Sequence, residues 1–231
     1  VTPANLSTVQ AALAAATDAT QLNTQAGLQT VVSNAANALV AIEAAAQANS
    51  ATATTPSAAQ YLALGVTGVD SNNLAAINSA LNDADITGTQ ANTAAKVQAI
   101  VDAYNAILTN ADGTANNASN PSQTNYASIG VSGVDSAEEE GLLGDVIDAK
   151  ASTDVNTVTQ VQALANAVQA VMNGNATQAQ LEALGVTGVT PDNLSTVQAA
   201  LAAVIAAGNT ATQFNTQAGL QTVVSNAANA L

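Results

Sequence analysis

The sequence lacks the side chains that most often act in catalysis and bind transition metals. It has no cysteine and no histidine, and its only basic residues are Lys96 and Lys150. Nucleophilic catalysis usually needs a base beside the nucleophile, so Ser–His and Cys–His pairs are excluded. Neither lysine lies in a motif typical of a Ser–Lys pair, and we expect Lys96 to be a surface charge. The absence of cysteine also excludes disulfides and thiolate metal sites.

Positive charge is equally scarce, because sixteen acidic residues face two lysines and the net charge is −14. Nucleic-acid binding normally requires a Lys- and Arg-rich surface that releases counterions, so we exclude nucleic acid as a partner. Anionic membrane surfaces are disfavoured for the same reason. The longest purely apolar run, residues 199–207, is far shorter than the roughly 20 residues needed to cross a bilayer. We therefore expect no membrane insertion by this segment.

Large core-forming side chains are few, since aromatic residues make up only 2% of the sequence. The core must therefore be built from Leu, Val, Ile and Ala, and the abundance of Ala favours helix. We predict an all-α fold. A binding surface would need an exposed apolar or aromatic patch. Phe214 is the best single candidate for such a patch, although packing in a core fits it better.

An internal repeat is the strongest signal that the sequence does contain. The segment ANLSTVQAALAA at 4–15 returns as DNLSTVQAALAA at 192–203. The segment NTQAGLQTVVSNAANAL at 23–39 returns unchanged at 215–231. Two weaker copies lie between these, so the chain holds four related segments.

A glycine turn marks the head of each later copy. GVTGV occurs at 65–69 and 185–189, and GVSGV at 130–134. A short helix is predicted before each turn, and the glycine that follows it suits a left-handed C-terminal cap. Because Val1-Thr2-Pro3 matches the sequence from Val189, we expect the first copy to lack this short helix and to leave an open groove. We also expect both ends of the printed sequence to be boundaries within a longer repetitive protein.

Two further helices are predicted in each copy. The long helix follows an Asn-Thr pair, and both residue types are natural N-caps. In the first copy its apolar residues recur at helical spacing along one stripe. That stripe is Leu28, Val31, Val32, Ala35 and Leu39. A middle helix precedes the long one, and Glu138–Glu140 opens it in the third copy, where acids suit the helix dipole.

Short helix, glycine turn, middle helix, loop and long helix together predict tandem three-helix-bundle modules in an elongated rod. The predicted modules span 1–52 (partial, without its short first helix), 53–118, 119–173 and 174–231. Bundles of this size bury only a marginal core. We therefore expect neighbouring modules to stabilise each other, as in solenoids.

Carboxylates offer only weak metal motifs. Asp83 and Asp85 resemble the start of a calcium loop, but Ala94 stands where the decisive glutamate is needed. Asp112 before Gly113 is a still weaker match, and a polar turn explains both segments better. We expect no catalytic residue, no cofactor and no metal site, and hence no enzyme.

The repeat LGVTGVDSNNLAAINSAL…NTAAKVQAIVDAYNAIL resembles the helical tandem repeats of giant surface adhesins of Gram-negative bacteria. Residues 61–66, YLALGV, are also similar to a step in the albumin-binding GA module, a three-helix bundle. The albumin-binding face of GA modules does not transfer, because the middle helix differs here. The adhesin resemblance implies an extracellular location on the bacterial surface, with a role in adhesion or biofilm.

We therefore expect a structural extender or adhesive repeat region whose partners are further copies of the same repeat. One alternative is a module that binds a host or matrix protein through its helix faces. Another is a filament subunit in which the open groove of the first copy receives a module of another chain.

Overall fold

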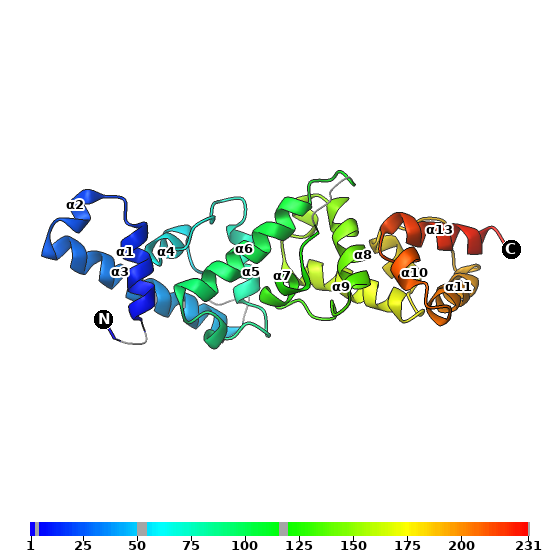
Figure 1. The fold of residues 1–231 in the computed structure, drawn as a ribbon, viewed down its shortest axis with the longest axis horizontal. Helices are drawn as coiled ribbons and strands as arrows, with labels where there is room; N and C mark the ends of the chain where they lie inside the picture. The colour runs from blue at the N-terminus through cyan, green and yellow to red at the C-terminus, as the bar shows by residue number, and fades with distance from the viewer. Residues whose placement is uncertain (3–4, 50–54, 116–119, 231) are drawn as a thin grey trace. The chain divides into compact units, whose positions relative to one another are not determined.

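The computed structural model describes residues 1–2, 5–49, 55–115 and 120–230. These residues form α-helices and two short 3-10 helices, with no β-strand among them (Figure 1). The predicted all-α class is therefore confirmed. Contacts group the chain into two compact units. The first unit contains residues 1–105, 128–130 and 156–158, and the second contains 106–127, 131–155 and 159–231.

In the first unit the chain begins with α1 (Leu6–Ala15), the short α2 (Ala19–Leu22) and the long α3 (Gln25–Ala48). The helices α4 (Ala58–Ala63) and α5 (Leu74–Leu81) follow, and α3 packs against α1, α2 and α4. After the 3-10 helix η1 (Gly88–Gln90), α6 (Ala94–Asn110) starts in this unit. The helix α3 therefore continues well beyond Leu39, the last residue of the apolar stripe of the first copy.

In the second unit, apart from Ser128 and Val158, which belong to the first, the same order of elements appears twice. The first series is α7 (Gln123–Ser128), α8 (Ala137–Asp148), η2 (Ser152–Asp154) and α9 (Val158–Met172). The second series is α10 (Gln178–Ala183), α11 (Leu194–Ala206), α12 (Thr210–Gln213) and α13 (Gln217–Ala228). Packing of α13 on α11 is the main helix pair of this last copy (Figure 1). The division into four modules stays a prediction.

The long helices start at the threonine of each Asn-Thr pair. Thr24 accepts a hydrogen bond at its hydroxyl from the Gly27 amide at 3.0 Å, and Thr216 from the Gly219 amide at 3.1 Å. The cap satisfies one of the free N–H groups of the first helical turn. Asn23 instead ends α2. The Asn-Thr pair therefore marks the start of the long helix as predicted, and the threonine is its N-cap residue.

A small helical turn precedes each long helix, where the sequence predicted a loop. These turns are α2, η1, η2 and α12. Asp18 starts α2 by accepting from the Thr20 amide at 2.8 Å. Elements of three or four residues show no hydrophobic periodicity, which is why the sequence does not reveal them.

The short helices are closed at both ends by local hydrogen bonds. Ser57 caps α4, and its amide donates to Gln60 Oε1 at 2.8 Å. At the other end the Val66 amide donates to the Tyr61 carbonyl at 3.0 Å across Gly65, whose φ is +84°. This six-to-one bond is a Schellman motif, which requires a left-handed residue at the glycine. The predicted glycine caps are confirmed at Gly65, Gly130 and Gly185, all with positive φ.

Buried side chains follow the predicted stripes. In α6 the residues Val97, Ile100, Val101 and Tyr104 are all buried. The few aromatic residues lie among them: Tyr61, Tyr104, Tyr126 and Phe214 are each 0% exposed. Inside the first unit the Tyr61 hydroxyl donates to Asn78 Oδ1 at 2.8 Å. The core is therefore mostly aliphatic, and these four aromatic rings are buried within it.

Candidate functional site

The most regular polar feature is a glutamine that joins the long helix to the glycine turn. In the second copy Gln98 Oε1 accepts from the Thr67 amide at 2.9 Å, and Gln98 Nε2 donates to the Thr67 carbonyl at 3.1 Å. Gln162 makes the same pair with Ser132 at 2.9 and 3.1 Å. Gln221 makes it with Thr187 at 2.8 and 3.1 Å. We call each pair a Gln–turn bridge.

Each Gln–turn bridge satisfies a backbone N–H and C=O in a turn that has no ladder partner. A second polar side chain supports the same turn. Asn73 Nδ2 donates to the Gly68 carbonyl at 2.6 Å, and Asn193 Nδ2 to the Gly188 carbonyl at 2.9 Å. These side-chain amides therefore hold each glycine turn against the helices of the same copy.

We expect Gln98→Ala, Gln162→Ala and Gln221→Ala each to lower the free energy of unfolding by about 1–2 kcal/mol. Each change removes two hydrogen bonds to backbone groups of the turn. Gln29 is the matched control, because its Nε2 donates to Ser33 on the same helix and no bridge involves it. Gln29→Ala should cost less than about 0.5 kcal/mol. Urea unfolding measures both, and equal losses at Gln29 and Gln221 would contradict the role of the bridge.

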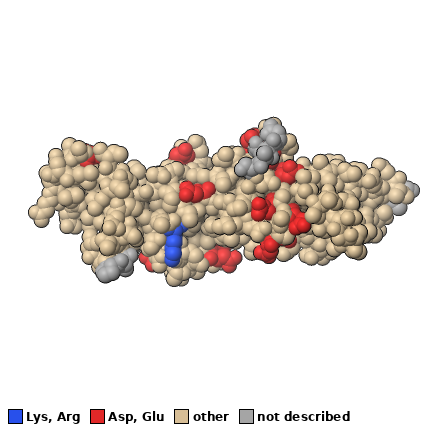
Figure 2. Space-filling model, viewed as in Figure 1, with Lys and Arg blue, Asp and Glu red and all other residues tan. Residues whose placement is uncertain are grey.

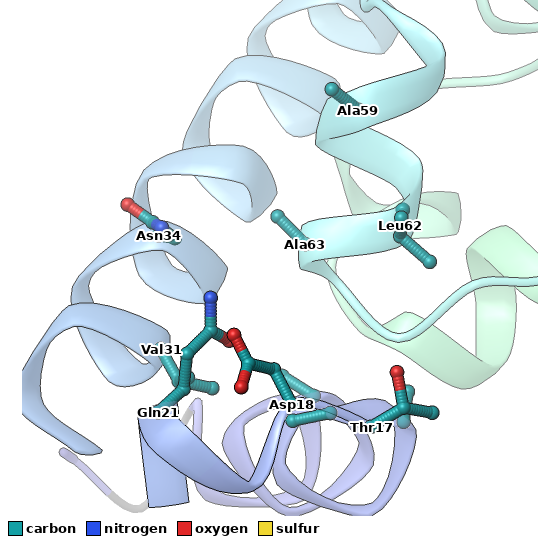
Figure 3. Close-up of a pocket in the computed structure, with 11 residues that line it drawn as sticks. Thr17, Asp18, Gln21, Val31, Asn34, Ala59, Leu62 and Ala63 are labelled. Atoms are coloured by element: carbon teal, nitrogen blue, oxygen red, sulfur yellow. The ribbon is translucent and has the colours of Figure 1, made fainter. Parts of the chain in front are cut away.

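The first unit contains an open groove with a volume of about 340 Å³. It lies between the end of α1, the start of α2, α3 and α4 (Figure 3). Figure 3 shows Asp18 and Gln21 side by side at one end and Ala59 and Ala63 on α4. Most of its lining side chains are small. The residues that line the groove are Ala12, Ala15, Ala16, Thr17, Asp18, Gln21, Val31, Asn34, Ala59, Leu62 and Ala63.

Asp18 is the one ionisable group in the groove lining. The hydroxyl and then the amide of Thr20 bind its carboxylate, and these hydrogen bonds lower the pKa of Asp18. The group is thus an ionised helix cap. A general acid or base needs a pKa near the working pH. The pKa of Asp18 is instead lowered, away from neutral pH, so the groove does not favour acid–base chemistry.

The calcium-like segment is a polar turn in the structure. Asp83 Oδ1 accepts from the Asp85 amide at 2.9 Å, as in an Asx turn, and burial raises the pKa of Asp83. Ala94 is buried at the start of α6. Asp112 likewise accepts from the Thr114 amide at 2.8 Å. Among residues 1–2, 5–49, 55–115 and 120–230, no three His, Cys, Asp or Glu side chains gather as metal ligands.

Three other charged residues also bind backbone groups. Glu139 Oε2 accepts from the Ser136 amide at 3.0 Å in a capping box at the start of α8. Lys96 Nζ donates to the Thr89 carbonyl at 2.7 Å, and Lys150 Nζ to the Ala183 carbonyl at 2.8 Å. Both lysines therefore bind carbonyls of short helical segments, Thr89 in η1 and Ala183 in α10. Lys96 is exposed, as expected for a surface charge.

Phe214 lies in the core of the last copy and is 0% exposed. It is therefore no surface residue, and the core packing expected for it is confirmed. In the described part of the chain, no helix combines the length and apolarity that crossing a membrane requires. Comparison with known protein families, curated proteins and solved structures found no match to this chain.

Proposed function

We propose that this chain is a structural spacer: tandem three-helix modules in an elongated rod that extends a bacterial extracellular surface protein. The observation that carries the proposal is the recurrence of the Gln–turn bridge in three copies. Side chains that repeat in identical bonding positions serve the internal structure of a repeated unit. A ligand site, in contrast, needs only one copy and converging reactive groups.

The surface chemistry supports the same role. On the face drawn in Figure 2, acidic side chains are scattered and most of the surface carries no charge. Only 8% of the residues are charged. Such a surface offers no strong field to attract nucleic acid or acidic substrates, and the net negative charge keeps chains apart in solution. The extracellular location and the part in adhesion or biofilm rest on the resemblance to adhesin repeats.

Small-angle X-ray scattering of the purified chain tests the rod. A compact domain of this length has a radius of gyration of about 17 Å. The proposal expects a clearly larger value, together with a helical circular dichroism spectrum. High salt serves as the control, because it screens charge repulsion and should leave the dimensions unchanged. A radius close to the compact value would contradict the spacer role.

A further inference from the structure

The threonine cap leaves the very first amide of each long helix to be satisfied by another group. In α6 the hydroxyl of Thr93 accepts from the Lys96 amide, which belongs to the third helical residue, at 3.3 Å. The first helical residue is Ala94 in α6 and Val158 in α9, and these residues are only 6% and 3% exposed. A buried amide needs a hydrogen-bond acceptor, and the first amides of a helix have none within the helix itself.

A side chain on the middle helix of the preceding copy accepts this amide at three junctions. The bonds run from the Ala94 amide to Thr8 Oγ1 at 3.3 Å, from the Val158 amide to Ser79 Oγ at 2.7 Å and from the Gln217 amide to Asp145 Oδ2 at 2.7 Å. Each bond lies inside one of the two compact units. We call Thr8, Ser79 and Asp145, which belong to α1, α5 and α8, the joint acceptors.

The joint acceptor occupies a different position of the middle helix in each copy, but always on one face. When the copies are aligned, the three positions are related as i, i+3 and i+4, which are neighbours on a helix surface. They hold Thr8, Ala11 and Ala12 in α1, Ala76, Ser79 and Ala80 in α5, and Gly141, Gly144 and Asp145 in α8. Each helix thus has one acceptor among alanines or glycines. The hydrogen bond recurs although its side chain moves by up to one helical turn.

The middle helix, or the residue that closely follows it, contacts the next copy at a second point. A Cβ at Gly65 would lie 2.7 Å from the Ala11 carbonyl oxygen, and a Cβ at Gly130 would lie 2.5 Å from Asp83 Oδ1. After α8, Lys150 Nζ donates to a carbonyl of α10 at 2.8 Å. The end of the short helix and the start of the long helix of one copy therefore both contact the same part of the preceding copy.

We propose that the joint acceptors couple the ordering of successive copies. A folded middle helix binds the first amide of the next long helix, and an unfolded one releases it. Nearest-neighbour interactions of this kind make tandem repeats fold cooperatively. Asp145 forms the strongest of the three bonds, because a carboxylate makes a charge-assisted hydrogen bond, about twice as strong as a neutral one. It also lies at the positive end of the helix dipole of α13.

The coupling goes beyond the spacer role and does not depend on it. The three hydrogen bonds are local and would be the same in an elongated or a compact particle. Scattering therefore tests the spacer role and amide exchange tests the coupling, so either proposal can fail while the other stands.

Asp145→Ala in the full chain tests the coupling, with amide hydrogen exchange resolved by NMR. Residues 220–224 of α13 should exchange about tenfold faster, because α13 opens more easily without the acceptor. Residues 142–147 of α8 should stay within about twofold of the parent, since alanine is the better helix former and does not weaken α8. Sequential assignment from Phe214 distinguishes α13 from its twin in α3, which follows Leu22.

The conservative variant Asp145→Asn separates the acceptor from the charge. Its side-chain carbonyl can still accept the Gln217 amide, so most of the protection of α13 should remain. Unchanged exchange in Asp145→Ala overturns the proposal. Equal losses in the Ala and Asn variants overturn it too, and so does a loss of the same size in α8 and α13, which would report general destabilisation.

Moving the acceptor within α1 provides an independent test at another junction. Thr8→Ala should accelerate exchange of residues 97–101 in α6 by about threefold or more. Adding Ala11→Ser to that variant places a hydroxyl at the position that Ser79 occupies in α5, and should restore much of the protection. A double variant that exchanges as fast as Thr8→Ala alone would contradict the role of the acceptor.

Discussion

Leu220→Ala is expected to lower the free energy of unfolding by about 2–5 kcal/mol, the usual cost of removing a buried leucine side chain. Leu28→Ala is expected to cost less than about 1 kcal/mol. Leu220 is 0% exposed and Leu28 is 39% exposed, within segments of identical sequence. Helix propensity changes equally at both positions, so the difference isolates packing.

Urea unfolding followed by circular dichroism measures both variants. Because the chain has two compact units, hydrogen exchange in α3 and α13 should accompany it to assign each loss to its own helix. Val224→Ala and Val32→Ala provide a second matched pair, since Val224 is 0% exposed and Val32 is half-buried. Equal losses at Leu28 and Leu220 would mean that the two copies are covered alike.

The chain is expected to unfold at alkaline pH, together with ionisation of its tyrosines. Burial raises the pKa of Tyr61, Tyr104 and Tyr126 well above the ordinary value of 10.0. A group whose pKa is raised by folding stabilises the folded state below its unfolded pKa. That contribution is lost as pH rises above about 10 toward the folded pKa. Each of the three side chains adds to the same loss.

Absorbance of tyrosinate and helical circular dichroism, recorded against pH, should change together above pH about 10. Tyr126→Phe is the informative variant. Among the described residues the Tyr126 hydroxyl has no hydrogen-bond partner, so Phe removes the ionisable group without leaving an orphaned acceptor. The variant should be as stable as the parent at pH 7 and should unfold at a higher pH. Tyrosine ionisation well before any loss of helix would contradict this account.

Much of the fold could be predicted because the repeat displays its own periodicity. The stripe of Leu28, Val31 and Ala35 returns in each copy with the same spacing, so one interpretation explains all four long helices. The glycines at 65, 130 and 185 mark left-handed caps because few other residues adopt positive φ.

The Gln–turn bridges could not be predicted from local pattern. Thr67 and Gln98 are far apart in sequence, and a hydrogen bond to a backbone group leaves no mark on the composition of the turn. A signal was nevertheless present, because a glutamine follows an apolar residue at the same place in every long helix. Those glutamines are Gln29, Gln98, Gln162 and Gln221. Only the three-dimensional structure shows that three of them share a partner of the same kind.

The helical turns before the long helices were missed for a different reason. In the first and last copies the turn lies close to a glycine of the long helix: a Cβ at Gly27 would lie 2.3 Å from the Gln21 carbonyl oxygen, and a Cβ at Gly219 2.6 Å from that of Gln213. The capping role of Ser57 and Thr177 follows standard N-cap chemistry and could have been assigned from sequence.

Thermal unfolding of the isolated segment 53–118 tests most directly whether each copy depends on its neighbour. In the first unit α4 packs on α3 of the preceding copy, and a Cβ at Gly65 would lie 2.7 Å from the Ala11 backbone. The isolated segment loses this packing, whereas the segment 1–118 keeps it and serves as the control. We predict that 53–118 is unfolded or melts far below the whole chain, and that 1–118 regains much of the difference. A 53–118 segment that melts at the temperature of the whole chain would show that every copy is complete by itself.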